Sequence, residues 1–227
     1  MDIEEIEHNF RLVKSNRINA SFALRTVKTS NLCIPLFVHT KEGNVFNICR
    51  QSVYMRCLVE VRKIIEPASS DKKANLCFII NKVYQNRDIF AQKHYYDDLN
   101  MPTNWFNDEL AEYEFGYKEY RESLAEDEKQ HRIDTIELVY NRWNKLWKLM
   151  GESEAFNFIR TARDNLVHSM SVANIYMPPM DKVQKLLNII LWFIRKLDYI
   201  INNCSSNYRD LDNQAEEIAT QFWEHMR

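Results

Sequence analysis

Apolar side chains recur every three to four positions over most of the chain, which is the spacing of one face of an α-helix. The pattern predicts helices over residues 3–27, 45–65, 71–88, 107–149, 153–170, 181–201 and 207–225. Residues 34–40 form a short apolar, β-branched run that contains Pro35, and we expect an extended connector there and not a sheet. The periodicity therefore predicts an all-α protein.

Glycine and proline are scarce, and most of them lie where the helical pattern changes. Pro67 is expected to end the second helix, and residues 69–71 (Ser-Ser-Asp) are N-cap candidates for the third. Gly116 is a candidate bend in the charged helix, and Gly151 is a candidate C-terminal cap for it. Long helices joined by short turns are the expected result.

The chain has 227 residues, of which 45% are hydrophobic, so it can bury one large core. We expect a single domain over residues 1–227, built as a bundle of long up-and-down helices. Residues 92–135 read as a loop followed by a charged helical insertion, most acidic over 108–128. Residues 207–227 are expected to form a C-terminal amphipathic helix.

Charge and cysteine usage narrow the class of protein further. The net charge is −2, so phosphate binding must come from a local cluster, such as the basic second half of the first helix. The alternative interpretation of this basic half is a solvated helix face. Five cysteines without a C-x-x-C pair suit free thiols in a reducing cytosol. The most apolar run, 186–201, is too short and too charged to span a bilayer. We therefore expect a cytoplasmic protein that does not enter a membrane.

Candidate chemistry is concentrated in the helix that starts near residue 153. Arg160, Asp164 and His168 follow one another at four-residue steps opposite an apolar stripe, with Arg163 on the flank. A guanidinium can hold a phosphate, and an imidazole can transfer a proton near neutral pH. Arg163 and His168 lie about 140° apart on an ideal helix. Either a second copy completes the site about a two-fold axis or the arginine curls back within one subunit. A solvated face with weak salt bridges is the alternative.

The sequence Arg-Asp-Asn-Leu-Val-His at 163–168, followed by Ser169, resembles the signature of the HEPN superfamily of helical ribonucleases. Upstream, residues 50–54 (Arg-Gln-Ser-Val-Tyr) and 58–67 resemble the abortive-infection U-type branch of that superfamily. The resemblance covers roughly residues 1–90 and 135–203.

This resemblance implies a HEPN-like helical bundle that forms a homodimer and cleaves RNA at a composite site, without a metal or another cofactor. It assigns phosphate binding to Arg163 and general acid or base catalysis to His168, with Asp164 in the polar position after the arginine. The remaining polar residues of the motif are expected to contact the RNA: Arg160, Asn165 and Ser169. A toxin or abortive-infection effector, with an antitoxin or other regulatory protein as partner, is the expected biological class.

Two other classes of function remain open. One is a catalytically inactive HEPN bundle that binds RNA, a nucleotide or a protein, and the other is a purely helical scaffold. Metal binding is not expected, because the Glu-x-x-His pairs Glu5–His8 and Glu128–His131 lie on charged faces. The acidic stretch 108–128 is a candidate mimic of RNA that covers a basic groove. Trp143, Trp147 and Trp192 are expected in the core.

Overall fold

The computed structural model describes residues 3–66, 74–95, 114–151, 178–204 and 208–224. Within these ranges the regular structure is helical and there is no strand, which confirms the all-α prediction. The long helices begin and end close to the predicted residues, because each carries an apolar stripe that can be buried against a neighbour.

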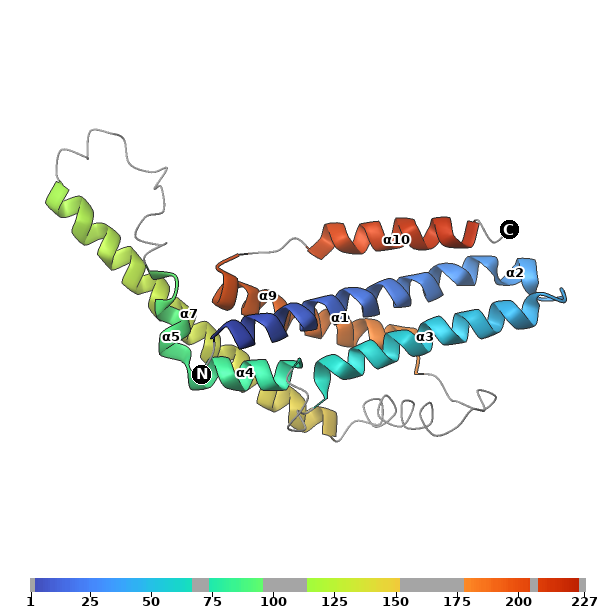
Figure 1. Ribbon diagram of the computed structural model, residues 1–227, viewed down its shortest axis with the longest axis horizontal. Helices are drawn as coiled ribbons and strands as arrows, with labels where there is room; N and C mark the ends of the chain where they lie inside the picture. The colour runs from blue at the N-terminus through green and yellow to red at the C-terminus, as the bar shows by residue number, and fades with distance from the viewer. Residues whose placement is uncertain (1–2, 67–73, 96–113, 152–177, 205–207, 225–227) are drawn as a thin grey trace.

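Helix α1 (Ile3–Ser30) is the centre of the bundle. It runs beside α3 (Gly43–Ile65) along the long axis of the molecule, and α9 (Met180–Asn202) and α10 (Tyr208–Glu224) also pack against it (Figure 1). Apolar residues of α1 enter the main core, which they share with α3, α4, α7 and α9: Ile6, Phe10, Val13, Ala20, Ala23, Leu24 and Val27.

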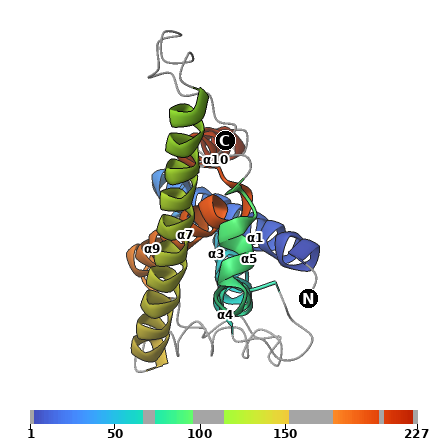
Figure 2. The same ribbon diagram turned by 90° about the vertical axis from the view of Figure 1, so that its left-hand side faces the viewer.

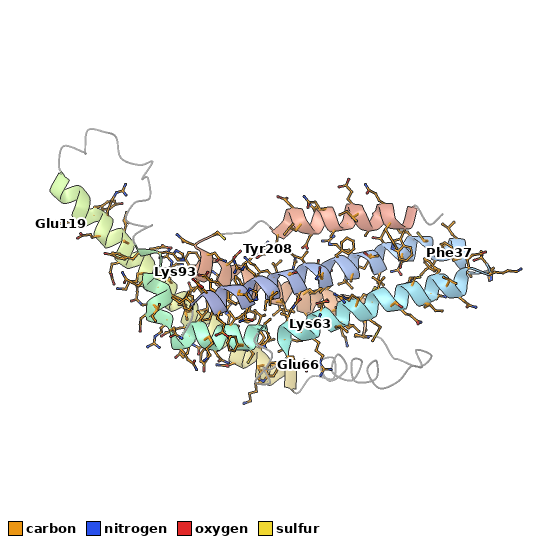
Figure 3. All side chains as sticks on the ribbon, in the orientation of Figure 1. Phe37, Lys63, Glu66, Lys93, Glu119 and Tyr208 are labelled. Carbon is orange, nitrogen blue, oxygen red and sulfur yellow. The ribbon has the colours of Figure 1, made fainter. Side chains whose placement is uncertain are left out.

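Helices α4 (Leu76–Gln85), α5 (Arg87–Gln92) and α7 (Glu114–Gly151) form the other end of the molecule. Figure 2 shows α7 along its length as it crosses α9, and its first turns project beyond the bundle. The helix continues through Gly116 and ends at Gly151. Lys93, labelled in Figure 3, joins this end to the bundle, because its Nζ donates to Glu7 of α1 at 2.5 Å and to the Ile201 carbonyl of α9 at 2.6 Å.

The connector between α1 and α3 is helical, so the prediction of an extended segment over 34–40 was wrong. A 3-10 turn, η1 (Asn31–Cys33), leads into the short helix α2 (Ile34–Phe37). Pro35 lies in the first turn of α2, where a backbone N–H has no helical partner and its loss costs little. The Phe37 ring stacks on Phe46 of α3 with centroids 4.4 Å apart. The following turn needs glycine at Gly43, because a Cβ there would lie 2.5 Å from the Phe37 carbonyl oxygen.

The end of α3 and the start of the next helix are set by two different signals. Glu66, the residue before Pro67, is extended (φ −66°, ψ 137°), as steric contact with a following proline favours. The predicted N-cap at 69–71 was wrong for α4. Its N-cap is Asn75, whose side-chain oxygen accepts a hydrogen bond from the Phe78 amide at 2.8 Å. Asn86 then separates α4 from α5, so the predicted third helix is two helices.

Burial of the apolar helix α9 and of the tryptophans follows the prediction. Trp143 is buried, and Trp147 and Trp192 are partly buried against the same core. Residues of α9 that the core covers include Leu187, Ile190, Ile194, Leu197 and Ile201. Among the described helices, none combines the length and apolar character needed to cross a membrane.

The Asn75 cap provides a test of how α4 begins. Replacing Asn75 with alanine leaves the buried start of α4 without its side-chain acceptor, and we expect the free energy of unfolding to fall by about 1 kcal/mol. Asn75→Ser keeps a short acceptor and is expected to retain most of that stability. Urea unfolding curves of the two variants measure the difference. Equal midpoints for the alanine and serine variants would contradict the cap.

Candidate functional site

The residues of the predicted motif lie outside the described residues. Arg160, Arg163, Asp164, Asn165, His168 and Ser169 all fall within residues 152–177. Their mutual geometry, like the predicted two-fold pairing of Arg163 and His168, therefore stays a prediction. What the structure describes is the framework at both ends of this segment, where α7 ends at Gly151 and the chain resumes at Pro178.

The C-terminal end of the segment is fixed to α3. The Tyr54 hydroxyl donates a buried hydrogen bond to the carbonyl oxygen of Pro178, directly before α9. Burial raises the pKa of Tyr54 above its ordinary range, and nearby Cys57 and Asp181 raise it further. Tyr54 therefore keeps its proton at neutral pH and remains a hydrogen-bond donor. The residue after the motif segment is thus held at a defined point of the bundle.

Cys57 lies one turn after Tyr54 and has no exposed surface. Burial raises the pKa of its thiol to about 12; the Glu60 carboxylate adds to the increase and the Lys28 ammonium opposes it. A thiol in this environment stays protonated and is a poor nucleophile near neutral pH. Cys57 is therefore a structural residue, in agreement with the expectation of free thiols.

Near the end of α7, a groove lies between α7 and α9. The groove has a volume of about 490 Å³, and its described lining residues come from the two helices: Arg142, Lys145, Leu146, Leu149, Asn188, Ile189, Trp192 and Phe193. The Arg142 guanidinium lies over the Trp192 ring, 4.8 Å from its centroid. Leu149 is 56% exposed and Ile189 is 40% exposed, so apolar surface remains open to a ligand.

The groove combines an aromatic ring, apolar surface, two cations and one amide side chain. Arg142 and Lys145 have no ion-pair partner among the described residues, so both cations are open to an anionic ligand. A planar base that packs on apolar surface and carries a phosphate matches this combination. The sequence analysis missed the groove because Trp192 was assigned to the core and Arg142 lies fifty positions away in the chain.

The basic half of α1 is not an open groove. Lys14 pairs with Asp198 of α9 at 2.9 Å, and Lys28 donates to Gln184 of α9 at 2.9 Å. Arg17 forms two hydrogen bonds with Asp212 of α10, and Arg25 pairs with Glu216 of the same helix. The alternative prediction of a solvated face fails for Arg17, which is buried under α10, whereas Arg11 and Lys28 are exposed.

The histidines of the described residues have structural or surface positions. His8 is exposed on α1. Glu128 accepts a hydrogen bond from the Tyr199 hydroxyl, and the His131 ring lies 6.0 Å from the Tyr199 ring. The buried His94 lies 3.1 Å from the Ile201 carbonyl through its Nε2 atom. In the part of the chain that the structure describes, no group of three or more His, Cys, Asp or Glu side chains is placed to hold a metal ion.

Comparison of the chain with protein-family models, with curated proteins and with solved structures gives no match.

The raised pKa of Cys57 predicts a loss of stability in alkali. The thiol ionises near its ordinary value of 9 in the unfolded chain but near 12 in the folded protein, so the folded state binds more protons between these values. Stability is then fully present below about pH 9, and this group removes about 1.4 kcal/mol of it per pH unit up to about pH 12. Urea unfolding between pH 8 and 11 measures the slope.

Two variants separate this thiol from other groups that titrate in alkali. Cys57→Ala is expected to lower stability at every pH but to flatten the alkaline decline. Cys204→Ala is the matched control, because Cys204 is exposed and its removal is expected to leave the slope unchanged. An equally steep decline in Cys57→Ala would show that burial of this thiol does not set the pH dependence.

Proposed function

We propose that the chain is a metal-independent endoribonuclease of the HEPN type that acts as a toxin or abortive-infection effector. The observation that carries the proposal is the sequence Arg163-Asp164-Asn165-Leu166-Val167-His168 in an all-α chain, between the long helices α7 and α9. The resemblance of residues 50–54 and 58–67 to the abortive-infection U-type branch supports it further. A cytoplasmic location and a homodimer belong to the same proposal.

The proposed reaction needs only proton transfer and charge stabilisation. A base removes the proton of a ribose 2′-hydroxyl, and the 2′-oxygen attacks the adjacent phosphorus. The bond from phosphorus to the 5′-oxygen breaks, and an acid protonates this leaving oxygen. The products are a 2′,3′-cyclic phosphate and a 5′-hydroxyl. His168 serves as acid or base, and Arg163 donates hydrogen bonds to the phosphate as negative charge accumulates.

The remaining motif residues have supporting roles in this proposal. Asp164 lies one helical turn before His168, so its carboxylate favours the protonated imidazole. Arg160, Asn165 and Ser169 contact the RNA beside the cleaved bond. An antitoxin or another regulatory protein restrains the activity in healthy cells.

The second candidate function is RNA or nucleotide binding without cleavage, and the groove between α7 and α9 favours it. Trp192, Arg142 and Lys145 provide a stacking surface and two positive charges at a site that needs no catalytic group. In the nuclease proposal, the same groove holds a nucleotide of the bound RNA, and its residue Leu149 is three positions before the motif segment begins at residue 152. A purely helical scaffold would need neither the stacking surface nor the two positive charges.

Cleavage of total RNA in excess EDTA tests the nuclease proposal. The wild type is expected to cleave, and His168→Ala is expected to lose about 10²- to 10⁴-fold in rate, the usual contribution of a general acid or base. Arg163→Ala is expected to lose about 10²- to 10³-fold, because it removes donors to the negative charge that accumulates on the phosphate. His8→Ala is the matched control, because His8 is an exposed histidine of α1. Cleavage that is equal in the wild type and His168→Ala would exclude His168 from the reaction. Binding without cleavage products in any variant would favour the second function.

Binding of a 2′-O-methylated oligonucleotide tests the groove without interference from cleavage. Trp192→Leu is expected to weaken binding by about 1–3 kcal/mol through lost stacking. Lys145→Gln is expected to reduce the slope of log affinity against log salt by about one. Lys148→Gln is the matched control, because Lys148 is exposed on the same helix but does not line the groove. Fluorescence anisotropy at several salt concentrations gives both quantities, and equal losses for the two lysine variants would contradict a specific groove.

A further inference from the structure

Four cations of α1 form one stripe along the helix. Lys14, Arg17, Arg25 and Lys28 fall within about 80° of one another around the axis at 3.6 residues per turn. The stripe extends over 14 residues, or about 21 Å of helix. The stripe consists of two pairs of cations, with Ser21 on the same face between them, and cations in one line along a helix can contact successive phosphates.

Helix α10 covers the central part of this stripe with carboxylates. Asp212 accepts hydrogen bonds from the two terminal nitrogens of Arg17 at 2.9 and 3.0 Å, and from the Ser21 hydroxyl at 3.0 Å. One turn later, Glu216 pairs with Arg25. As a result the Arg17 side chain is only 1% exposed. An acidic face therefore lies along the basic stripe in the same way that a polyanion would.

Two nitrogens of the stripe are left without an acceptor under α10. The Nε atoms of Arg17 and Arg25 are buried, and neither has a hydrogen-bond partner among the residues that the structure describes. A buried donor without a partner carries a cost of about 1–3 kcal/mol. Two carboxylates thus do not use all the donors of two guanidiniums, whereas a phosphate brings more acceptor oxygens and matches the planar arginine fork. These unused donors indicate that the carboxylates of α10 match the basic stripe incompletely, and that another anion can replace them.

The apolar contact of α10 lies on one side, where Tyr208 enters the main core and Trp223 packs against Cys33 and against Phe46 of α3. Figure 1 shows α10 at the outer edge of the bundle, alongside α1, and Figure 3 marks Tyr208 at its start. The buried residues of α10 are Tyr208, Ala215, Ala219 and Trp223, two of them alanines. The Glu216 side chain is 64% exposed, so its pair with Arg25 is open to solvent and salt. The Trp223 indole also donates a buried hydrogen bond to the Thr26 carbonyl at 2.6 Å. Burial therefore holds the two ends of α10, and charge pairing with Arg17 and Arg25 holds its middle.

We propose that the basic stripe of α1 is a second RNA-binding surface, specific for the phosphate backbone, and that α10 occupies it until RNA displaces the helix. The proposal rests on the proposed function for the identity of the polyanion. Asp212 and Glu216 stand in for two phosphates in the RNA-free protein. RNA that replaces them gains the unused Nε donors of Arg17 and Arg25, and α10 swings away with its acidic face exposed.

The full-length double variant Asp212→Asn/Glu216→Gln tests the proposal. It keeps the shape of α10 but removes both charges that face the stripe. We expect a 2′-O-methylated single-stranded oligonucleotide to bind about tenfold more tightly, with a steeper salt dependence. Glu137→Gln/Glu217→Gln is the matched control, because it makes the same change in net charge at two exposed positions outside the stripe. The control is expected to change affinity little.

Two further measurements make each outcome informative. Hydrogen exchange of the α10 amides is expected to accelerate in Asp212→Asn/Glu216→Gln, and addition of Arg25→Gln to this variant is expected to remove its gain in affinity. Unchanged exchange would overturn charge pairing as the attachment of α10. Faster exchange without tighter binding, or equal gains in variant and control, would overturn the RNA surface.

The oligonucleotide carries no 2′-hydroxyl, so these measurements do not depend on cleavage. If His168→Ala leaves RNA cleavage unchanged but the stripe variant gains affinity, the proposed nuclease site fails and the binding surface stands. If cleavage depends on His168 and the variant gains nothing, the binding surface fails alone.

Discussion

The carboxylate of Asp198 is fully buried at the point where three helices meet, and the arrangement of the bundle depends on how it is neutralised. Lys14 of α1 donates to Oδ1 at 2.9 Å, Asn202 of α9 donates to the same oxygen at 2.7 Å, and the Tyr208 hydroxyl of α10 lies 3.2 Å from Oδ2. A buried charge costs several kcal/mol unless its oxygens are paired. Apolar packing alone would allow α9 to slide along α1, but any shift would separate Asp198 from Lys14. The Asp198 carboxylate also fixes the start of α10 through Tyr208.

Helix α1 consequently makes two kinds of contact on two of its sides, one apolar and one between charges. Its apolar stripe meets α3, α4 and α9 and supplies much of the core, while its basic stripe meets carboxylates of α9 and α10. The first contact is insensitive to salt, and the second weakens with salt to the extent that it is exposed. Arg17 and Asp212 are the least exposed pair between α1 and α10, and Arg25 and Glu216 are more open. The bundle therefore has an apolar core and, along one edge, a helix held by charge pairs in its middle and by the buried Tyr208 and Trp223 at its ends.

Sequence periodicity was sufficient for α1, α3, α9 and α10, because long amphipathic or apolar stripes determine which face is buried. It failed at residues 34–40, where a short apolar run fits a strand and a helix equally well and the stacking of Phe37 on Phe46 decides. It also could not distinguish Asn75 from the serines at 69–70 as a cap, since all are good acceptors. The partners of the basic residues could not be predicted from the sequence, because Arg17 and Asp212 are 195 positions apart in the chain. For the motif at 163–168, residue types indicate the chemistry, but spacing alone does not determine which groups meet.

If the chain binds RNA as we propose, local charge, and not the net value of −2, determines which surface it uses. On α1, Arg17 and Arg25 are already paired with carboxylates, so a nucleic acid must compete with Asp212 and Glu216 before it can bind there. In the groove of α7 and α9, Arg142 and Lys145 have no acidic partner among the described residues, and the Trp192 ring and apolar side chains beside them are partly exposed. A first encounter therefore costs less at the groove than at the stripe. The groove is also close to the motif segment in sequence, because Leu149 is three positions before residue 152, whereas the stripe lies under a helix that must first leave. We therefore propose that RNA binds first at the groove, and that the basic stripe of α1 binds only RNA that the groove already holds.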